Sequence, residues 1–583
     1  MAKTPLRPLL IAIVLNTTFV GCDAGEGSLS SGGMHADPTG PGPGSDTDLP
    51  PDTPDPPDPE ERPEPGDDTG TPQTCAEGIC AVAADMRRLT GVQIRNSVHD
   101  LFYGQIHTEA PLPAPGVSVT GYSGEANANA VNDAATEQLL HLAEEVALQV
   151  AERTGVLLEG CDGPGRDDFD CALQFIGHYG RRAWRRPLTD DEWSVVLQVY
   201  QAGEEADLPF EERIALMTEV LLQAPQFLYQ IEIGEPVDDQ PQLRRLTDFE
   251  LASRMAYLLW DTLPDEALLS AAEDGQLRTR TQIEAQARRM LDDARAHGAA
   301  LRFFREWMQL GGSHLHDKDW ALAGFDPSLA DAMEAGLDQY LLHTIFDTDG
   351  TLEDLLSSTT GFIDEQLADF YDVPFSGEPV DLGPERAGLL TRPAFLAEKA
   401  SPTESSPIHR GVFVIERMLC GDLGSPPDDA LERFQALERG ANPRAQSEIL
   451  RAVPECNGCH ARIDSAGLGF EAYGPLGELR EVYRDGTLID ASSEIWEGSV
   501  RGSFEDLGEM QRFLADQPEV LDCLTRQWFQ SMFGRHVHDF TREDRRAIAH
   551  LQGQARQSGG QIRALMLNLV TSDAFRYRHI EEN

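Results

Sequence analysis

Two cysteines and a histidine that can do chemistry together stand at Cys456, Cys459 and His460, in the sequence Cys-Asn-Gly-Cys-His. Two thiols three residues apart lie on one side of a helical turn, where both can bond the vinyl groups of a porphyrin. A histidine directly after the second thiol can place its imidazole on the iron. The spacing therefore predicts one covalent haem c, with Cys456 and Cys459 as its attachment points and His460 as an axial ligand.

Two other uses of these cysteines stay open. A structural zinc site needs a second pair of ligands at similar spacing, and no second C-x-x-C occurs in the chain. A plain disulfide between Cys456 and Cys459 needs no further partner. A thioredoxin-like redox pair would follow a strand in a βαβ unit, which the helical pattern of this region does not offer.

The sixth ligand of such an iron is not fixed by the sequence. Met510 and Met532 follow the motif, where a distal methionine would be found, but each also shares a helical face with apolar residues and suits core packing. His536 and His538 are further candidates, with solvent exposure as the alternative. An iron without a sixth side chain could bind a small ligand.

The N-terminus predicts export. Lys3 and Arg7 precede an apolar run over residues 9–15, which is too short to span a bilayer and is typical of a signal peptide. Phe-Val-Gly-Cys at 19–22 resembles a bacterial lipobox, so we expect Cys22 to carry a lipid. Cleavage as an ordinary signal peptide is the alternative. The mature protein is expected in the periplasm or at the cell surface, anchored to a membrane as a lipoprotein.

The segment 23–74 predicts a disordered linker. It holds 12 prolines and 13 acidic residues against one arginine, and it cannot bury enough apolar surface to offset the entropy of ordering. Proline and like charges keep such a chain extended, so it would act as a spacer between the lipid and the folded part.

The charge of the whole chain excludes one class of partner. Its 47 Lys and Arg stand against 99 Asp and Glu, for a formal net charge of −52. Such a surface repels phosphate backbones, so no nucleic acid is expected to bind.

The remaining cysteines suit an oxidising compartment. We expect two short loops, closed by Cys75 with Cys80 and by Cys161 with Cys171, although four cysteines allow three connectivities. Cys420 and Cys523 flank the haem motif and could either bridge across it or remain buried thiols.

Apolar spacing predicts a mainly α protein made of several helical domains, including helices over 133–153 and 211–230. Capping boxes are expected at Thr189, Thr247 and Thr281, and a small hairpin over 480–490. The expected segments are 1–22 (signal and lipobox), 23–74 (linker), 81–160, 167–234 and 243–373 (helical domains), 384–495 (cytochrome c-like haem domain) and 500–580 (C-terminal helical domain).

Two further groups of charged residues have a structural and a functional interpretation. Asp261, Asp265 and Glu266 could form a carboxylate site, but acids beside Pro264 are also what a helix N-terminus needs, and capping is favoured. Arg410 and Arg480 could pair with haem propionates or form surface salt bridges.

Long segments of the chain resemble a known family, the multi-domain cytochrome-like envelope proteins of planctomycetes and myxobacteria. The family carries consecutive domains of unknown function 1587, 1595, 1592, 1588 and 1585. "MRRLTGVQIRNSVHDLF" (86–102) resembles its first domain and "CNGCHARIDSAGLGFEAYGPLGELR" (456–480) its fourth. The family continues C-x-x-C-H with Ile-Asp-Pro-x-Gly. Here Ser465 replaces the proline, which affects the loop geometry and leaves the haem ligands unchanged.

The resemblance implies an envelope c-type cytochrome-like protein and no particular substrate. We expect electron transfer to or within an envelope partner, as one component of an oxidoreductase. The alternative is a non-enzymatic surface lipoprotein that binds a polymer or scaffolds a complex, with the haem or a disulfide in a structural role.

Overall fold

The computed structural model describes residues 79–580, with gaps at 84–85, 117, 162–166, 312–313, 321–323, 428 and 438–439. Helices dominate and the strands are short, which confirms the predicted mainly α fold. The predicted signal peptide, the lipid site Cys22, the linker at 23–74 and Cys75 lie outside the described residues. Cys80 is disulfide-bonded. Within the described ranges, no helix combines the length and apolarity that a membrane span requires.

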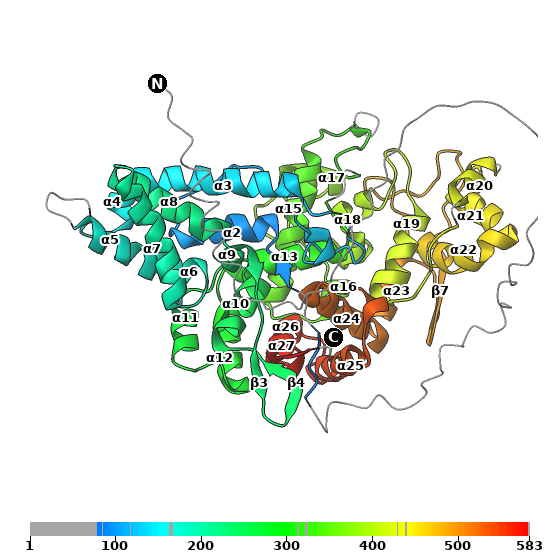
Figure 1. The fold of residues 1–583 in the computed structure, drawn as a ribbon. Helices are drawn as coiled ribbons and strands as arrows, with labels where there is room; N and C mark the ends of the chain where they lie inside the picture. The colour runs from blue at the N-terminus through cyan, green and yellow to red at the C-terminus, as the bar shows by residue number, and fades with distance from the viewer. Residues whose placement is uncertain are drawn as a thin grey trace, which may run out of the picture. The chain divides into compact units, whose positions relative to one another are not determined.

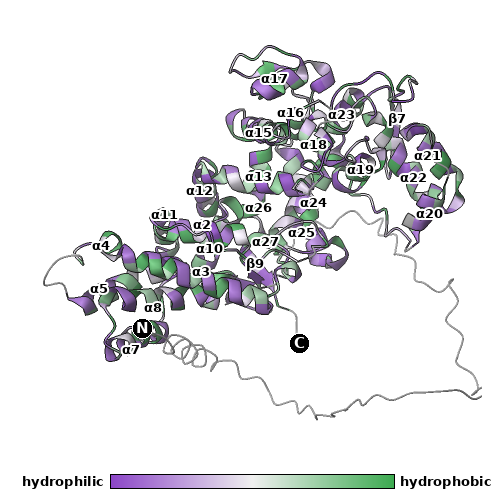
Figure 2. Cartoon of the chain, turned by 90° about the horizontal axis from the view of Figure 1, so that it is seen from above, coloured by the Kyte–Doolittle hydropathy of each residue, from purple (hydrophilic) through white to green (hydrophobic). Residues whose placement is uncertain are grey.

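The first hydrophobic core lies between helices of the N-terminal third. Two of its helices, α3 and α8, pack along each other (Figure 1). Leu139, Leu142, Val146 and Val150 recur at helical spacing on α3 and are buried, and Figure 2 shows hydrophobic and hydrophilic residues sharing this helix. The helices are α2 (Gly91–Leu101), α3 (Asp133–Glu152), α4 (Thr154–Leu157), α5 (Asp168–Phe175), α6 (Arg181–Ala183), α7 (Asp190–Glu205), α8 (Phe210–Gln223) and α9 (Pro225–Leu228).

A second, larger core draws most of its buried residues from the stretch between Leu246 and Phe575, and Cys80, Val82 and Tyr122 join it from the N-terminal part. Its first helices are α10 (Asp248–Leu259), α11 (Glu266–Glu273), α12 (Arg280–Leu291), α13 (Arg295–Trp307), α15 (Leu329–Leu342), α16 (Leu352–Ser357) and α17 (Glu365–Tyr371). Next come α18 (Pro393–Glu398), α19 (Pro407–Val412), α20 (Ala430–Ala436), α21 (Pro443–Ala452) and α22 (Pro454–Gly467). The last are α23 (Leu507–Ala515), α24 (Pro518–Phe533), α25 (Arg542–Gln557), α26 (Ile562–Thr571) and α27 (Asp573–Arg576).

Short antiparallel strands join segments that are distant in sequence. β9 (Tyr577–His579) pairs with β4 (Gln240–Arg245), which also pairs with β3 (Glu235–Val237). β1 (Arg87–Arg88) pairs with β2 (Tyr229–Gln230), and β5 (Thr360–Gly361) with β6 (Val380–Asp381). The longest ladder is the hairpin of β7 (Ser493–Glu497) and β8 (Val500–Phe504).

Three local expectations need correction. The boxes at Thr189 and Thr247 are present, but α12 is capped by Thr279 with Gln282, which leaves Thr281 inside the first turn. The helix expected over 211–230 ends at Gln223, because the residue before Pro225 takes an extended conformation. The small hairpin expected over 480–490 is present but shorter than expected, since it is held by a single antiparallel bridge, from Val482 to Leu488, and has no strands.

A buried ion pair links α10 to Glu232, which follows β2, and the same arginine reaches the C-terminal helix α27. The Arg254 guanidinium of α10 binds both carboxylate oxygens of Glu232 and donates to the backbone oxygen of Phe575 at 2.7 Å. Burial alone would raise the pKa of Glu232, but the charge and hydrogen bonds of Arg254 outweigh it and hold that pKa below its ordinary value. Glu232 therefore remains ionised in the folded protein at neutral pH.

Candidate functional site

α22 carries the Cys-Asn-Gly-Cys-His sequence and lies beside α20 and α21, at the right edge of Figure 1. Pro454 occupies its first position, where the missing N–H costs no helical hydrogen bond. Cys456 is half-buried, Cys459 is exposed, and neither thiol is in a disulfide. Because the two cysteines are three positions apart, both thiols lie on one side of the helix. The structure thus leaves this pair available for a covalent partner.

The His460 ring is held by two successive hydrogen bonds. Its Nδ1 lies 2.9 Å from Oδ1 of Asp464, one turn further along α22. Asp464 is fully buried, and its Oδ2 accepts from the hydroxyl of Ser447 on α21 at 2.7 Å. A carboxylate that accepts the Nδ1 proton fixes the tautomer whose Nε2 lone pair can bind a metal. The His460 side chain is 19% exposed, so its ring is only partly covered by protein.

Ser447 and Asp464 were not predicted as site residues. The sequence signal for Asp464 is its spacing of four residues from His460, which places both side chains on one helical face. Ser447 comes from the preceding helix, and no local pattern in the sequence indicates that contact.

α22 is positioned by a close crossing with α19 that depends on two glycines. A Cβ on Gly467 would lie 1.9 Å from the backbone oxygen of Pro407, and a Cβ on Gly411 would lie 2.0 Å from that of Ile463. Both distances are far below any real contact. The two backbones can approach this closely only because neither position carries a side chain.

Arg410 braces the turn that follows α22. Its side chain is fully buried, and its two terminal nitrogens donate to four backbone oxygens, those of Phe470, Tyr473, Leu396 and Gly474, at 2.8–3.1 Å. The sequence suggested that Arg410 pairs with a haem propionate or forms a surface salt bridge. Neither interpretation fits, because the guanidinium is buried and donates to backbone carbonyls. It is a structural residue.

For Arg480 the structure leaves one of the two sequence interpretations open, the pairing with a haem propionate. It donates through Nε to the backbone oxygen of Glu471 at 3.0 Å and through Nη2 to the Ser405 hydroxyl at 2.7 Å. The Glu471 carboxylate lies 3.2 Å away and is fully buried, so this ion pair is not a surface salt bridge. Arg480 also lines a pocket beside α22.

A disulfide anchors the chain that runs past Cys459. Cys420, at the end of the segment after α19, is bonded to Cys523 of α24. The chain then passes α22, where Cys459 Sγ lies 3.6 Å from the Leu423 backbone oxygen and Arg462 donates to that of Asp422 at 2.9 Å. The sequence left open whether these two cysteines are bonded or free. In the first core, Cys161 and Cys171 form a second disulfide.

The structure shows the surroundings of the four candidates for a sixth ligand. Met510 is fully buried in the larger core, near Gly469, whose Cβ would lie 3.6 Å from its methyl group. Met532 lines a small pocket with Arg87 and Thr90, residues from the N-terminal part of the chain. His536 accepts the backbone N–H of His538 at 3.3 Å. Within the described ranges, no hydrogen bond or ring contact joins any of them to His460, so the sixth ligand stays a prediction.

A pocket of about 450 Å³ lies beside α22, on the side of Asp464. Its walls come from the 403–408 segment, α20, the start of α21 and residues 480–484. Ser447 and Asp464 both line it, so the pocket reaches the hydrogen bonds that hold His460. In the described part of the chain, no group of three or more His, Cys, Asp or Glu residues is placed to hold a metal ion.

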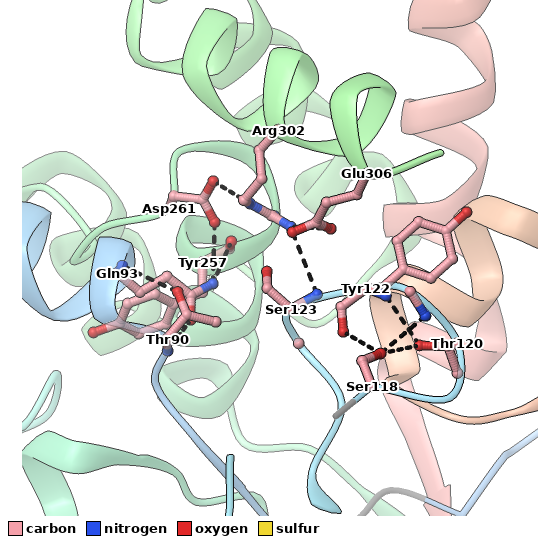
Figure 3. A network of polar contacts seen from close by, with 12 residues as sticks. Thr90, Gln93, Ser118, Thr120, Tyr122, Ser123, Tyr257, Asp261, Arg302 and Glu306 are labelled. Carbon is pink, nitrogen blue, oxygen red and sulfur yellow. Dashed lines mark hydrogen bonds and ion pairs between the residues drawn. The ribbon is translucent and has the colours of Figure 1, made fainter. Parts of the chain in front are cut away.

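A second concentration of polar side chains joins α2, α13 and the 118–125 loop (Figure 3). Asp261 accepts from Arg302 Nε at 2.7 Å and from Gln93 Nε2 at 3.0 Å, and Arg302 Nη1 lies 3.3 Å from Glu306. Glu306 also accepts the backbone N–H of Ser123 at 3.3 Å. A pocket of about 380 Å³ lies alongside. Since Asp261, Arg302 and Glu306 pair with one another, we interpret this network as structural. It holds α2, α13 and the 118–125 loop together.

The carboxylates of residues 261–266 do not form a common site. Asp265 caps α11 by accepting the backbone N–H of Leu268 at 2.9 Å, which confirms the capping prediction for this residue. Glu266 pairs with Arg181 and Arg182, whereas Asp261 belongs to the network of Figure 3.

Comparison with known proteins gives five matches to family models, each described as a protein of unknown function. In chain order they cover residues 87–152 (DUF1587), 171–232 (DUF1595), 246–373 (DUF1592), 386–483 (DUF1588) and 501–575 (DUF1585). This is the order that the sequence resemblance predicts. α22 falls within the DUF1588 match. No curated protein and no solved structure matches the chain.

Proposed function

Because the chain belongs to the multi-domain cytochrome-like family in which these five domains follow one another, we propose that α22 carries one covalent haem c. We further propose that the protein passes electrons to or within a partner in the cell envelope. The observation that supports this most is the geometry of His460, whose Nδ1 is held by the buried Asp464. The donor set of two unpaired thiols and one oriented imidazole fits a c-type haem.

Each residue of the set has a distinct part in this proposal. Cys456 and Cys459 form thioether bonds that fix the porphyrin to the helix. His460 binds the iron through Nε2. Asp464 keeps the Nδ1 proton in place and increases the electron donation of the ring, and Ser447 fixes the carboxylate. The bound haem supplies one-electron oxidation and reduction. The chain's residues set its orientation, its exposure and its potential.

The proposed location follows from the N-terminal residues. Export would bring the chain to a compartment where disulfides persist, and Cys161–Cys171 and Cys420–Cys523 suit such a compartment. A lipid on Cys22 and the acidic linker would then hold the folded part at a distance from the membrane, in the periplasm or at the cell surface.

A redox titration of the exported, full-length protein tests the electron-transfer part of this proposal. We expect one reversible one-electron transition, followed by the absorbance of the haem. A haem that stays in one oxidation state over the accessible potentials would contradict electron transfer. That result would support the alternative, a lipoprotein in which the haem only stabilises the folded chain.

A further inference from the structure

Two histidines of the N-terminal third lie side by side at the surface. His99 is in the last turn of α2, and His107 follows it after a short loop, with the two ring centroids 5.2 Å apart. The loop turns sharply because Tyr103 and Gly104 both have left-handed backbone, with φ of +53° and +73°. This conformation is unfavourable for a bulky residue such as tyrosine. The chain therefore accepts backbone strain where it folds His107 back onto His99.

The backbone of both histidines is held in place. The backbone oxygen of His99 accepts the N–H of Gly104 at 2.8 Å. Gln149 of α3 binds both backbone groups of His107, because its Oε1 accepts the N–H at 3.4 Å and its Nε2 donates to the oxygen at 2.6 Å. Both histidine side chains are exposed. The two rings are thus accessible to solvent on a backbone that is already ordered.

Asp100 orients the His99 ring for binding a metal ion. Nδ1 of His99 lies 2.9 Å from Oδ1 of Asp100. A carboxylate that accepts the Nδ1 proton leaves the lone pair on Nε2, which is the form of histidine that binds metals. A Cβ on residue 104 would lie 3.2 Å from this Nε2, so the glycine leaves the space beside it open. The nearby Arg182 donates to the backbone oxygen of Asp100, and its charge is paired with Glu266.

The spacing of the two rings fits two ligands of one tetrahedral ion. Zn²⁺ binds imidazole nitrogen at about 2.0–2.1 Å, and the ring centroid lies about 1.1–1.2 Å beyond that nitrogen. At the tetrahedral angle, the centroids of two such rings are about 5.2 Å apart. The centroids of His99 and His107 have this separation.

Two further histidine pairs of the described ranges suit a metal ion less well. Nδ1 of His536 accepts the backbone N–H of His538 at 3.3 Å, so the proton of the neutral His536 ring is on Nε2. The rings of His314 and His409 are 6.3 Å apart, wider than the tetrahedral spacing. Partial desolvation, His314 and Lys399 lower the pKa of His409, and basic neighbours also repel a metal cation.

We propose that His99 and His107 bind one Zn²⁺ ion beside the first core. Nε2 of His99 is one ligand, a ring nitrogen of His107 is the second, and water takes the two remaining positions. Asp100 is a positioning residue that orients the first ligand. The net charge of −52 favours the approach of a cation to this chain. The site uses no residue of α22, so the inference does not rest on the proposed function.

Calorimetric titration of Zn²⁺ into the full-length chain tests the site. The background is Cys456→Ala/Cys459→Ala, which removes two thiols that would compete for the ion. Asp100→Asn should weaken Zn²⁺ binding by about tenfold, because residues that orient a metal ligand typically contribute about 10–100-fold to affinity. His99→Ala and His107→Ala should each weaken it further, because each removes a ligand.

His343→Ala is the matched control. Nδ1 of His343 lies 3.1 Å from Oδ2 of Asp347, as in the pair of His99 and Asp100, but the ring beside His343 is that of Phe362. We expect this variant to bind Zn²⁺ as the background chain does.

Three results would overturn the inference. The first is a background chain that shows no saturable Zn²⁺ binding. The second is binding that His99→Ala and His107→Ala leave unchanged, which would place the ion on carboxylates elsewhere in this acidic chain. The third is an equal effect of Asp100→Asn and His343→Ala in variants with unchanged circular dichroism. Failure of the wild type to carry haem would refute the proposed function alone, because these titrations need no haem.

Discussion

Replacement of Asp464 by asparagine tests the part of the site that the structure defines best. Asp464→Asn keeps the size of the side chain and removes the negative charge next to Nδ1 of His460. The carboxylate is fully buried and lies 2.9 Å from this nitrogen, so little solvent screens its effect. A negative charge here favours the more positive, oxidised iron. The variant is therefore expected to have a higher reduction potential than the wild type.

The size of the shift follows from the hydrogen bond. A bond to a charged acceptor contributes about 1.5–3 kcal/mol and a neutral one about 0.5–1.5 kcal/mol, so by the midpoints of these ranges the variant loses about 1.3 kcal/mol. If the oxidised state receives all of this difference, the potential rises by about 55 mV, because about 59 mV is a tenfold change for one electron. This value is an upper bound, since the reduced state also gains from the bond.

The assay is a spectroelectrochemical titration of the haem-loaded protein. Asp422→Asn is the matched control. Asp422 precedes Leu423 on the chain beside α22, its side chain is exposed, and its carboxylate accepts the backbone N–H of Gly424. We expect the control to shift the potential far less, because solvent and salt screen an exposed charge. A fall in potential for Asp464→Asn, or equal shifts in both variants, would refute the reasoning.

Three further predictions concern stability, each measured by urea unfolding followed by tryptophan fluorescence and circular dichroism. Gly467→Ala should destabilise the protein by about 1–3 kcal/mol, because its Cβ has no room in the helix crossing, whereas Gly458→Ala on the same helix meets no atom within 4 Å and should not destabilise it. Equal effects of the two would contradict the crossing. Cys420→Ser/Cys523→Ser opens a loop with a sequence separation of 103 and should cost about 4.7 kcal/mol by the chain-entropy estimate, and an unchanged midpoint would refute this link. Glu232→Gln leaves a buried guanidinium unpaired and should cost about 3–5 kcal/mol at neutral pH. Since the folded pKa of Glu232 is lowered, the difference from wild type should be complete above about pH 5 and shrink as pH falls through the folded pKa. A difference that stays constant to pH 3 would rule out the ion pair as its source.

Local sequence patterns predicted the local parts of this fold. The apolar spacing over 133–153 identifies α3 almost to the residue, since the periodicity is strong and Asn132 caps the helix. The capping box at Thr189 could be predicted for the same reason, because it depends only on the consecutive residues 189–192. Where two threonines compete, as Thr279 and Thr281 do, the pattern alone does not decide which of them caps the helix.

The tertiary parts of the site could not be predicted in this way. The contact from Ser447 to Asp464 depends on how α21 packs against α22, and the crossing of α19 depends on Gly411 and Gly467 meeting backbone from another helix. No periodicity encodes either arrangement. The same is true of Arg410, whose partners are carbonyls from turns at some distance in the sequence. For an arginine the sequence suggests exposure, and here the side chain is buried with both terminal nitrogens bonded to backbone oxygens.

The central claim is that Cys456 and Cys459 hold a haem whose iron binds His460. The most direct measurement is the absorption spectrum of the exported protein, air-oxidised and then reduced with dithionite, before and after acid–acetone extraction. We expect a sharp reduced α-band that survives extraction and is absent from Cys456→Ala/Cys459→Ala. Absence of a haem band in the wild type, produced together with the machinery that attaches c-type haem, would contradict the account.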